Sequence, residues 1–331
     1  MEKRVITDLV ECMKLWHALV RPKNIFDLWE FRLCFHRHFK NRPFFLILED
    51  KDGIAGMLPL SFVEDFDMFV FFPGEIWQGK TWLERTPIYF RNEASLHELL
   101  WACPERTYLR YMEVQGDNYF AELTVDEIGY VFYPELIHFD MEQYWKRFSK
   151  KRYKDIIKTV SRVTGDSKAF YINRLEDFDH LVHMSLTNFG PNSYLYDDRF
   201  RRSLRDVVDF LDRCGLLRMV SLEVRGESAA IDMGALYGGI YTVFLGGTHP
   251  DFLGVAKVMN MHHMEFACKE CISKVDFLCG DFHWKKLWHL DPEPLYKFVT
   301  HDLLAEREME VPAVTYDTFR FLGHTGASLQ R

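Results

Sequence analysis

Polar residues suited to acid–base chemistry gather near the C-terminal end of the chain. A short apolar run, Val275 to Leu278, predicts a buried strand, and Gly280-Asp281-Phe282-His283 follows it directly. Polar groups at the end of a strand lie at a sheet edge, where α/β proteins tend to bind ligands. Because a carboxyl group in a desolvated cleft can act as general base on an attacking amine, Asp281 is the first candidate catalytic residue.

Three further residues are candidates for the same chemistry. Histidine side chains titrate near physiological pH, so His283 is a rival base. Lys285 is a candidate donor to the oxyanion of a tetrahedral intermediate. Asp232 is the only charged residue in the apolar run Ala229 to Tyr237, and a lone acid there is either paired or lines a cleft. For each candidate, a structural role such as a salt bridge is an equally good interpretation.

A small-residue turn opens a predicted helix and could bind an anion. Gly254, Val255, Ala256 and Lys257 begin this helix. The first N–H groups of a helix lack intrahelical partners and carry the positive end of its dipole, so a closely approaching diphosphate could bind them. The alternative is that Gly254 and Ala256 only make a tight turn between a strand and the helix.

A basic stretch runs from Lys146 to Lys154 in an otherwise acidic chain. Ser149 can cap a helix here, which places Lys151 and Arg152 in its first turn. Cations in a first turn oppose the helix dipole, and a bound anion would relieve that conflict. We therefore expect Lys151 and Arg152 to bind a ligand, whereas the ordinary interpretation of such a run is a solvated helix face.

Aromatic residues provide two further candidates for substrate binding, Tyr194 and Trp284. Tyr194 follows Gly190-Pro191 in a predicted loop, and loops often carry recognition residues. Trp284 and Trp288 are four residues apart, so on a helix they would more simply form one core stripe.

Four residues have the spacing of a zinc site, Cys268, Cys271, Cys279 and His283. Turns rich in glycine or proline usually hold such cysteine pairs, and none flanks Cys268 or Cys271. The favoured interpretation is that these cysteines are small buried hydrophobic residues, so no metal is expected.

Length and composition indicate a globular protein of two domains. The chain has 331 residues, 48% of them hydrophobic, and a net charge of −8. The acidic balance argues against broad nonspecific binding of nucleic acids. The N-terminus lacks the pattern of a signal peptide and no window suggests a membrane span, so a cytoplasmic location is expected.

Strand and helix patterns alternate along the chain, which predicts an α/β or α+β arrangement with mixed sheets flanked by helices. We expect a domain boundary near residue 135, after Tyr133-Pro134. The predicted elements begin with a helical opening over 8–39. The strands are predicted at 44–49, 54–63, 68–72, 108–114, 170–173, 217–224, 229–237, 239–245 and 275–278, and the later helices at 93–102, 141–147, 152–163, 176–188, 197–214 and from 254.

Three separated segments together resemble the FemAB-like GNAT acyltransferases, and more closely their CelD-type members. These are the strand pair Pro43 to Leu60, the basic helix Phe148 to Val163, and the C-terminal stretch from Ser228 to Phe298. The resemblance covers most of the chain. It implies two tandem GNAT-like domains: residues 1–135, binding the acceptor or serving structure, and residues 136–331, binding the donor and catalysing transfer.

The resemblance also implies the reaction. An acyl group would pass from acyl-CoA, such as acetyl-CoA, to an amine or hydroxyl acceptor, a small molecule or an envelope or polysaccharide precursor. The family usually places Gln or Arg three residues before the first glycine of the helix start, whereas this chain has Asp251. Two alternatives remain: aminoacyl transfer from aminoacyl-tRNA, as in Fem ligases, and a non-catalytic binding protein with the same fold.

Overall fold

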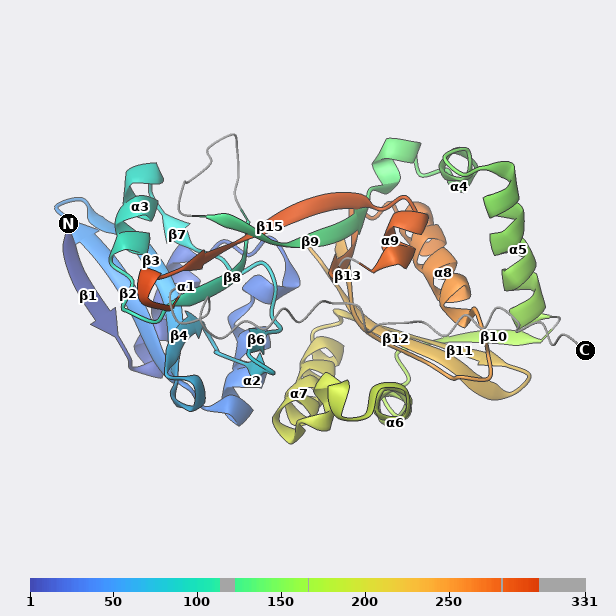
Figure 1. The fold of residues 1–331 in the computed structure, drawn as a ribbon, viewed down its shortest axis with the longest axis horizontal. Coiled ribbons are helices and arrows are strands. Elements are labelled where there is room, and N and C mark those ends of the chain that lie inside the picture. The colour runs from blue at the N-terminus through green and yellow to red at the C-terminus, as the bar shows by residue number, and fades with distance from the viewer. Residues whose placement is uncertain (114–122, 166, 281, 304–331) are drawn as a thin grey trace, which may run out of the picture.

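The computed structural model describes residues 1–113, 123–165, 167–280 and 282–303. Two halves lie side by side, and two long strands, β9 and β15, run between them (Figure 1). Helices flank the sheets of both halves, as the alternation of patterns predicts. In the part of the chain that the structure describes, no helix combines the length and the apolar character needed to cross a membrane.

The N-terminal half begins with a strand and two helices. Asp8 caps the first helix and Asn24 caps the short turn before the second. Its elements are β1 (Glu2–Ile6), α1 (Leu9–Leu19), η1 (Ile25–Asp27), α2 (Trp29–Phe39), β2 (Arg42–Asp50), β3 (Gly53–Val63), η2 (Glu64–Phe66), β4 (Met68–Phe71), β5 (Ile76–Trp77), β6 (Lys80–Thr81), β7 (Tyr89–Phe90), α3 (Glu93–Trp101), β8 (Tyr108–Met112) and β9 (Thr124–Phe132).

The C-terminal half carries the helix that the sequence predicts Ser149 to cap: the Ser149 hydroxyl accepts from the Arg152 N–H at 3.2 Å. Its elements are η3 (Pro134–Ile137), α4 (Met141–Trp145), α5 (Lys150–Thr164), β10 (Lys168–Ile172), α6 (Asp177–Phe189), η4 (Gly190–Asn192), η5 (Tyr194–Tyr196), α7 (Asp198–Arg213), β11 (Leu217–Val224), β12 (Glu227–Tyr237), β13 (Ile240–Thr248), α8 (Val255–Lys269), β14 (Lys274–Cys279), α9 (His283–Leu287) and β15 (Asp291–Val299).

The two halves repeat one order of elements: strand, two helices, three strands, helix, strand. β1, α1, α2, β2, β3, β4, α3 and β8 form the first copy, and β10, α6, α7, β11, β12, β13, α8 and β14 form the second. The strand order shows the same repeat in space. The eight-stranded sheet runs β10-β11-β12-β13-β14-β9-β15-β8. The five-stranded sheet runs β1-β2-β3-β4, with β7 also paired to β3, and β5 and β6 form a small sheet of their own. Phe69 of β4 bridges to Thr107 beside β8. From either end, equivalent strands follow in the same order.

The middle strands are exchanged between the halves. β9 follows β8 in the chain but pairs with β14 and β15, and β15 follows β14 but pairs with β8 and β9. The predicted boundary at residue 135 falls just after β9 in the chain, so strands from both sides of it share one sheet.

Alternating side chains of the C-terminal sheet fill two separate cores, as the two-residue period of a strand requires. Met219 and Ile231 face α6 and α7, whereas Val220 and Ala230 face α5 and α8. The first core also contains residues of the N-terminal half, Trp82 among them. The connection between β4 and α3 therefore packs onto the C-terminal half.

Candidate functional site

β13 and β14 are parallel neighbours that pair over three residues each. The pairs join Ile240–Thr242 to Lys274–Asp276, and beyond them 243–248 and 277–279 do not pair with each other. We call these two unpaired parts the fork. β14 changes direction at Leu278, whose φ is 60°. The edge of β13 in the fork is therefore left open to an extended ligand.

Asp232 lies on β12 at the fork. It is opposite Gly246 of β13, and its Oδ2 lies 2.8 Å from Nε2 of His263 on α8. A Cβ on Gly246 would lie 2.4 Å from the Asp232 Oδ1, so only glycine leaves room for this carboxylate. The Asp232 side chain is 14% exposed. It is thus both paired and placed beside the open edge of β13.

A chain of hydrogen bonds leads from the interior to Asp232. Nδ1 of the fully buried His263 lies 3.0 Å from the Tyr241 hydroxyl, and Arg218 hydrogen-bonds to Tyr241. Burial raises the pKa of Tyr241, so its hydroxyl keeps its proton. The hydroxyl can then donate to Nδ1, which leaves the hydrogen on Nε2 to be donated to Asp232.

The other candidate catalytic residues have different surroundings. The Lys285 ammonium is buried and donates to the carbonyl oxygens of Phe277, Leu278 and Cys279 at 2.9, 2.8 and 2.7 Å. Because an ammonium has three hydrogens, none remains for an oxyanion in this arrangement, and burial lowers the pKa of Lys285. His283 is exposed at the start of α9. Asp281 lies outside the described residues.

The residues of the predicted anion-binding turn form the start of α8. Gly254 has a φ of 90° and caps the helix, and the N–H groups of Val255 and Lys257 already bond to the carbonyls of Phe252 and Gly254. Within the described residues, the Gly254 and Ala256 N–H groups have no protein partner. Asp251 does not cap the helix, and its side chain is 83% exposed.

Three cations surround this helix start. Burial lowers the pKa of Lys257, and electrostatic repulsion by Arg152 and Arg162 of α5 lowers it further. Arg162 donates to the Leu253 carbonyl at 2.8 Å, and Nε of Arg152 is buried without a partner in the described structure. Like charges held this close favour a bound anion. The structure thus brings predicted Arg152 and Lys257 together, while Lys151 is exposed nearby on α5.

The two candidate aromatic residues lie apart. Tyr194 packs against Trp77 of the N-terminal half, with the rings tilted by 38° and their centroids 4.4 Å apart, and so lies at the junction of the halves. Trp284 is half-buried and packs edge-on against Phe277 at the fork, at 6.0 Å. Trp288 is 2% exposed and lies in the core, as the sequence predicts.

Two buried charges from the N-terminal half reach β14, and the sequence analysis missed both. Both carboxylate oxygens of Glu84 accept from the Cys279 N–H, at 2.9 and 3.0 Å, and Nε of Arg85 lies 2.8 Å from Asp276. Burial raises the pKa of Glu84 to about 7, and the charge of Asp276 adds to this rise. Glu84 and Arg85 lie in a stretch without helix or strand periodicity, so no sequence signal marked them.

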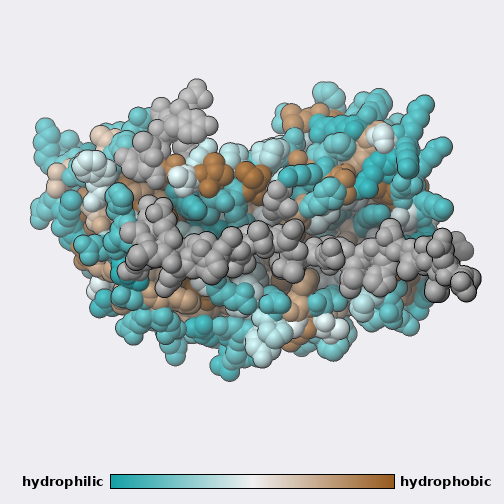
Figure 2. Space-filling view, viewed as in Figure 1, coloured by the Kyte–Doolittle hydropathy of each residue, from teal (hydrophilic) through white to brown (hydrophobic). Residues whose placement is uncertain are grey.

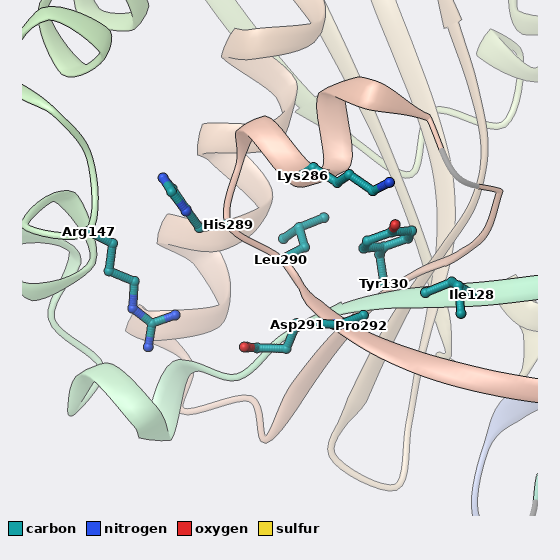
Figure 3. Close-up of a pocket in the computed structure, with 8 residues that line it drawn as sticks. All are labelled: Ile128, Tyr130, Arg147, Lys286, His289, Leu290, Asp291 and Pro292. Atoms are coloured by element: carbon teal, nitrogen blue, oxygen red, sulfur yellow. The ribbon is translucent and has the colours of Figure 1, made fainter.

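A cavity of about 660 Å³ lies beside the exchanged strands (Figure 3). Basic side chains border it next to an apolar floor; its lining residues are Ile128, Tyr130, Arg147, Lys286, His289, Leu290, Asp291 and Pro292. The surface is hollowed between the halves in this region, with exposed hydrophobic side chains (Figure 2). Burial raises the pKa of Asp291, whereas Arg147 opposes the rise. The lining suits a ligand with an apolar part and an anionic group.

The cysteines with zinc-like spacing are not arranged as a site. Cys268 lies on α8 and is buried in the core, and Cys271 is exposed. Among the residues with described positions, no group of three or more His, Cys, Asp and Glu side chains could hold a metal ion.

The chain is similar to a known family of domains and to several solved structures. A family model described as acetyltransferase (GNAT) domain matches residues 150–286, which include α5, the fork and α8. The solved structure of FemX covers 93% of this chain and 99% of its own at 10% identity, with a TM-score of 0.58. The L-PGS structure from Bacillus licheniformis covers 92% and 95% at 9% identity, with a TM-score of 0.56.

A third solved structure has the same fold. The C-terminal domain of a putative lysylphosphatidylglycerol synthetase from Agrobacterium fabrum covers 84% of this chain and 90% of its own, at 10% identity and a TM-score of 0.51. No curated protein sequence matches the chain. Residues 150–286 are thus similar to a GNAT acetyltransferase domain, and the three solved structures share the fold of the whole chain, whose two halves repeat one order of elements.

Proposed function

We propose that the protein transfers an acyl group from acyl-CoA to an amine or hydroxyl acceptor by direct attack. The observation that carries this proposal is the cation cluster at the start of α8, where Arg152, Arg162 and Lys257 surround two unpaired N–H groups. A diphosphate would neutralise these charges and accept from the N–H groups of Gly254 and Ala256. GNAT domains generally use acyl-CoA, whose diphosphate fits this requirement.

The fork would hold the rest of the donor. α8 follows β13 in the chain, so its anion-binding start lies close to the end of the open β13 edge. The amide groups of an extended acyl-CoA arm could pair with that edge as a short additional strand. The thioester would then lie near Asp232.

In the chemical step, the acceptor lone pair attacks the thioester carbonyl carbon. The new C–N or C–O bond forms, the C–S bond breaks, and the CoA thiolate leaves. We assign Asp232 as the base that takes the acceptor's proton, with His263 holding the carboxylate in place. Backbone N–H groups at the fork, rather than Lys285, are the candidate oxyanion donors. Asp281 and His283 remain candidates for contact with the acceptor.

We assign the acceptor's anionic part to the cavity beside β9 and β15. Arg147, Lys286 and His289 border the cavity, and Tyr130 separates it from the Lys285 ammonium, 5.5 Å from the Tyr130 ring. Since Lys285 caps the end of β14, this cavity adjoins the fork. An envelope or polysaccharide precursor with an acidic group matches this lining, and Tyr194 at the junction could contact a longer acceptor.

Aminoacyl transfer from aminoacyl-tRNA is the second candidate function. The exposed lysines of α5, which include Lys150, Lys151, Lys154 and Lys158, favour it because they could contact a phosphate backbone. The solved structures with this fold include FemX and L-PGS.

Calorimetry with acetyl-CoA, desulfo-CoA and a charged tRNA separates the candidates. Micromolar binding of both CoA compounds supports the acyl-CoA proposal. Binding of charged tRNA alone would replace it with the second candidate. Release of CoA thiol from acetyl-CoA with a panel of amines and alcohols, some with acidic groups, then identifies the acceptor class.

A further inference from the structure

We propose that the N-terminal half completes the donor site: Glu84 and Arg85 are positioning residues that hold β14 away from β13 and so keep the fork open. This inference rests on the proposed function, because the fork is where the extended arm of the donor would lie. It gives the N-terminal half a part in donor binding, a role that the family match to residues 150–286 does not cover.

Side chains form hydrogen bonds with the backbone groups of β14 in the fork. The Leu278 N–H donates to the Asp276 carboxylate at 2.9 Å, and the Cys279 N–H donates to Glu84. The three carbonyls from Phe277 to Cys279 accept from Lys285. In continuous ladders, the backbone groups of alternate residues would instead bond to β13 on one side and to β9 on the other. The fork therefore depends on these side chains.

Arg85 anchors the segment that carries Glu84. Arg85 is 4% exposed, and its guanidinium contacts Asp276 of β14, Glu293 of β15 at 2.7 Å, and Glu113. Two of these carboxylates come from the C-terminal half. Arg85 therefore fixes the connection that carries Glu84 against β14, at the last residue that still pairs with β13.

The repeat of the fold also links the N-terminal half to the fork. In the C-terminal half, residues 249–254 join β13 to α8 and form the anion-binding turn. In the N-terminal half, the equivalent connection between β4 and α3 is the much longer segment 72–92, which contacts the other half through Trp82 and Glu84. The place of the anion-binding turn in the first copy is thus taken by a segment that shapes the site of the second.

Removal of the Glu84 carboxylate should narrow the fork between β13 and β14. It leaves the Cys279 N–H without its acceptor, and an unpaired buried N–H costs about 1–3 kcal/mol. The nearest remedy is for the end of β14 to shift toward the open edge of β13, whose carbonyls could accept. That shift would narrow the fork and compete with the donor.

The test compares desulfo-CoA affinities by calorimetry for wild type, Glu84→Gln, Glu84→Met and Glu75→Met. Glutamine retains an acceptor oxygen for Cys279, whereas methionine fills the volume without one. Glu75 is the matched control: it is 1% exposed in the same segment and accepts from Trp82 and Leu83 N–H groups, not from β14. We expect Glu84→Met to bind about tenfold more weakly and Glu84→Gln and Glu75→Met to bind within about threefold of wild type.

Two outcomes overturn the inference: wild-type affinity in Glu84→Met, or equal losses in Glu84→Met and Glu75→Met, which would indicate only damage to the segment. If Glu84→Met does not fold, Arg85→Lys is the milder variant. Lysine keeps the positive charge but cannot contact several carboxylates at once as the guanidinium does. Wild-type affinity for desulfo-CoA in Arg85→Lys would also contradict the inference. If wild type binds no desulfo-CoA, the proposed function itself fails, a result distinct from both.

Discussion

At the scale of residues, the candidate site contains buried polar groups whose neighbours decide what each can do. From the sequence, Asp232 and Lys285 are both catalytic candidates, each with a structural role as the alternative. The structure distinguishes their surroundings. Asp232 is partly exposed at the fork, whereas the Lys285 ammonium donates all three of its hydrogens to carbonyl oxygens. His263, which orients Asp232, stands 31 residues away in the chain, and no local pattern connects the two.

Asp232→Asn tests the assigned base. Asparagine keeps the size of the side chain but cannot take a proton, so turnover with an identified acceptor should fall by about 100-fold or more. Affinity for acetyl-CoA should remain within about twofold, because the diphosphate contacts are elsewhere. Steady-state kinetics and calorimetry measure the two quantities, with the exposed Asp209→Asn as control. Wild-type turnover in Asp232→Asn would exclude this role.

Glu84 predicts a pH dependence of stability. Its pKa is raised from 4.5 to about 7 in the folded protein, so between these values the folded state keeps a proton that the unfolded chain has lost. The free energy of unfolding contributed by Glu84 is therefore complete below pH ~4.5 and is lost as the pH rises through ~7, by up to about 3 kcal/mol. Urea unfolding of Glu84→Gln between pH 5 and 8 should show a shallower decline than wild type. Parallel curves for the two proteins would contradict the prediction.

At the scale of elements, most helices and most of the longer strands followed from the sequence, but six strands and the helix α9 did not. The predicted helical opening over 8–39 is two helices, because Pro22 and the Asn24 cap lie between α1 and α2. The unpredicted strands are β1, β9, β15 and the two-residue strands β5, β6 and β7. β15 contains Pro292 and Pro294, which argue against a central strand, and it exists because β8 and β9 flank it. Such pairings depend on tertiary contacts that no local pattern encodes.

The packing of α5 on the start of α8 can be tested by a double-mutant cycle. A Cβ on Gly254 would lie 2.5 Å from the Thr159 methyl group, and the φ of 90° disfavours any side chain there. Gly254→Ala should lower the free energy of unfolding by about 2–4 kcal/mol. Adding Thr159→Ser removes the methyl group and should restore at least about 1 kcal/mol. Strict additivity of the two changes in urea unfolding would show that the helices do not meet as described.

At the scale of the whole molecule, the exchanged strands join the halves into one continuous arrangement. β9 lies beside β14, and β15 lies beside β8, so each half supplies the partner strand that the other needs. Sequence analysis predicted the tandem repeat through resemblance alone, since the repeat does not appear as sequence identity. It could not predict the exchange, because either half could equally have kept its own strand.

Residues 136–331 expressed alone should therefore fail to form a stable domain. This fragment lacks β8 and β9, so β14 loses a neighbour and β15 has none of its pairs. Unpaired strand edges promote aggregation. We expect no cooperative unfolding transition by circular dichroism, and the full chain is the control. A folded fragment with the stability of the full chain would contradict the structural role of the exchange.

The acetyl-CoA affinity of wild type and of the double variant Arg152→Gln/Lys257→Gln at two salt concentrations tests whether the donor binds at the start of α8. We predict micromolar binding for wild type, weakened by added salt, and a loss of about 50-fold or more in the double variant, because each charge-assisted phosphate contact contributes about 1.5–3 kcal/mol. Lys158→Gln, a change at an exposed lysine on the same helix, should bind like wild type. Equal affinity in the double variant and wild type, or no binding by wild type, would contradict a donor site at the start of α8.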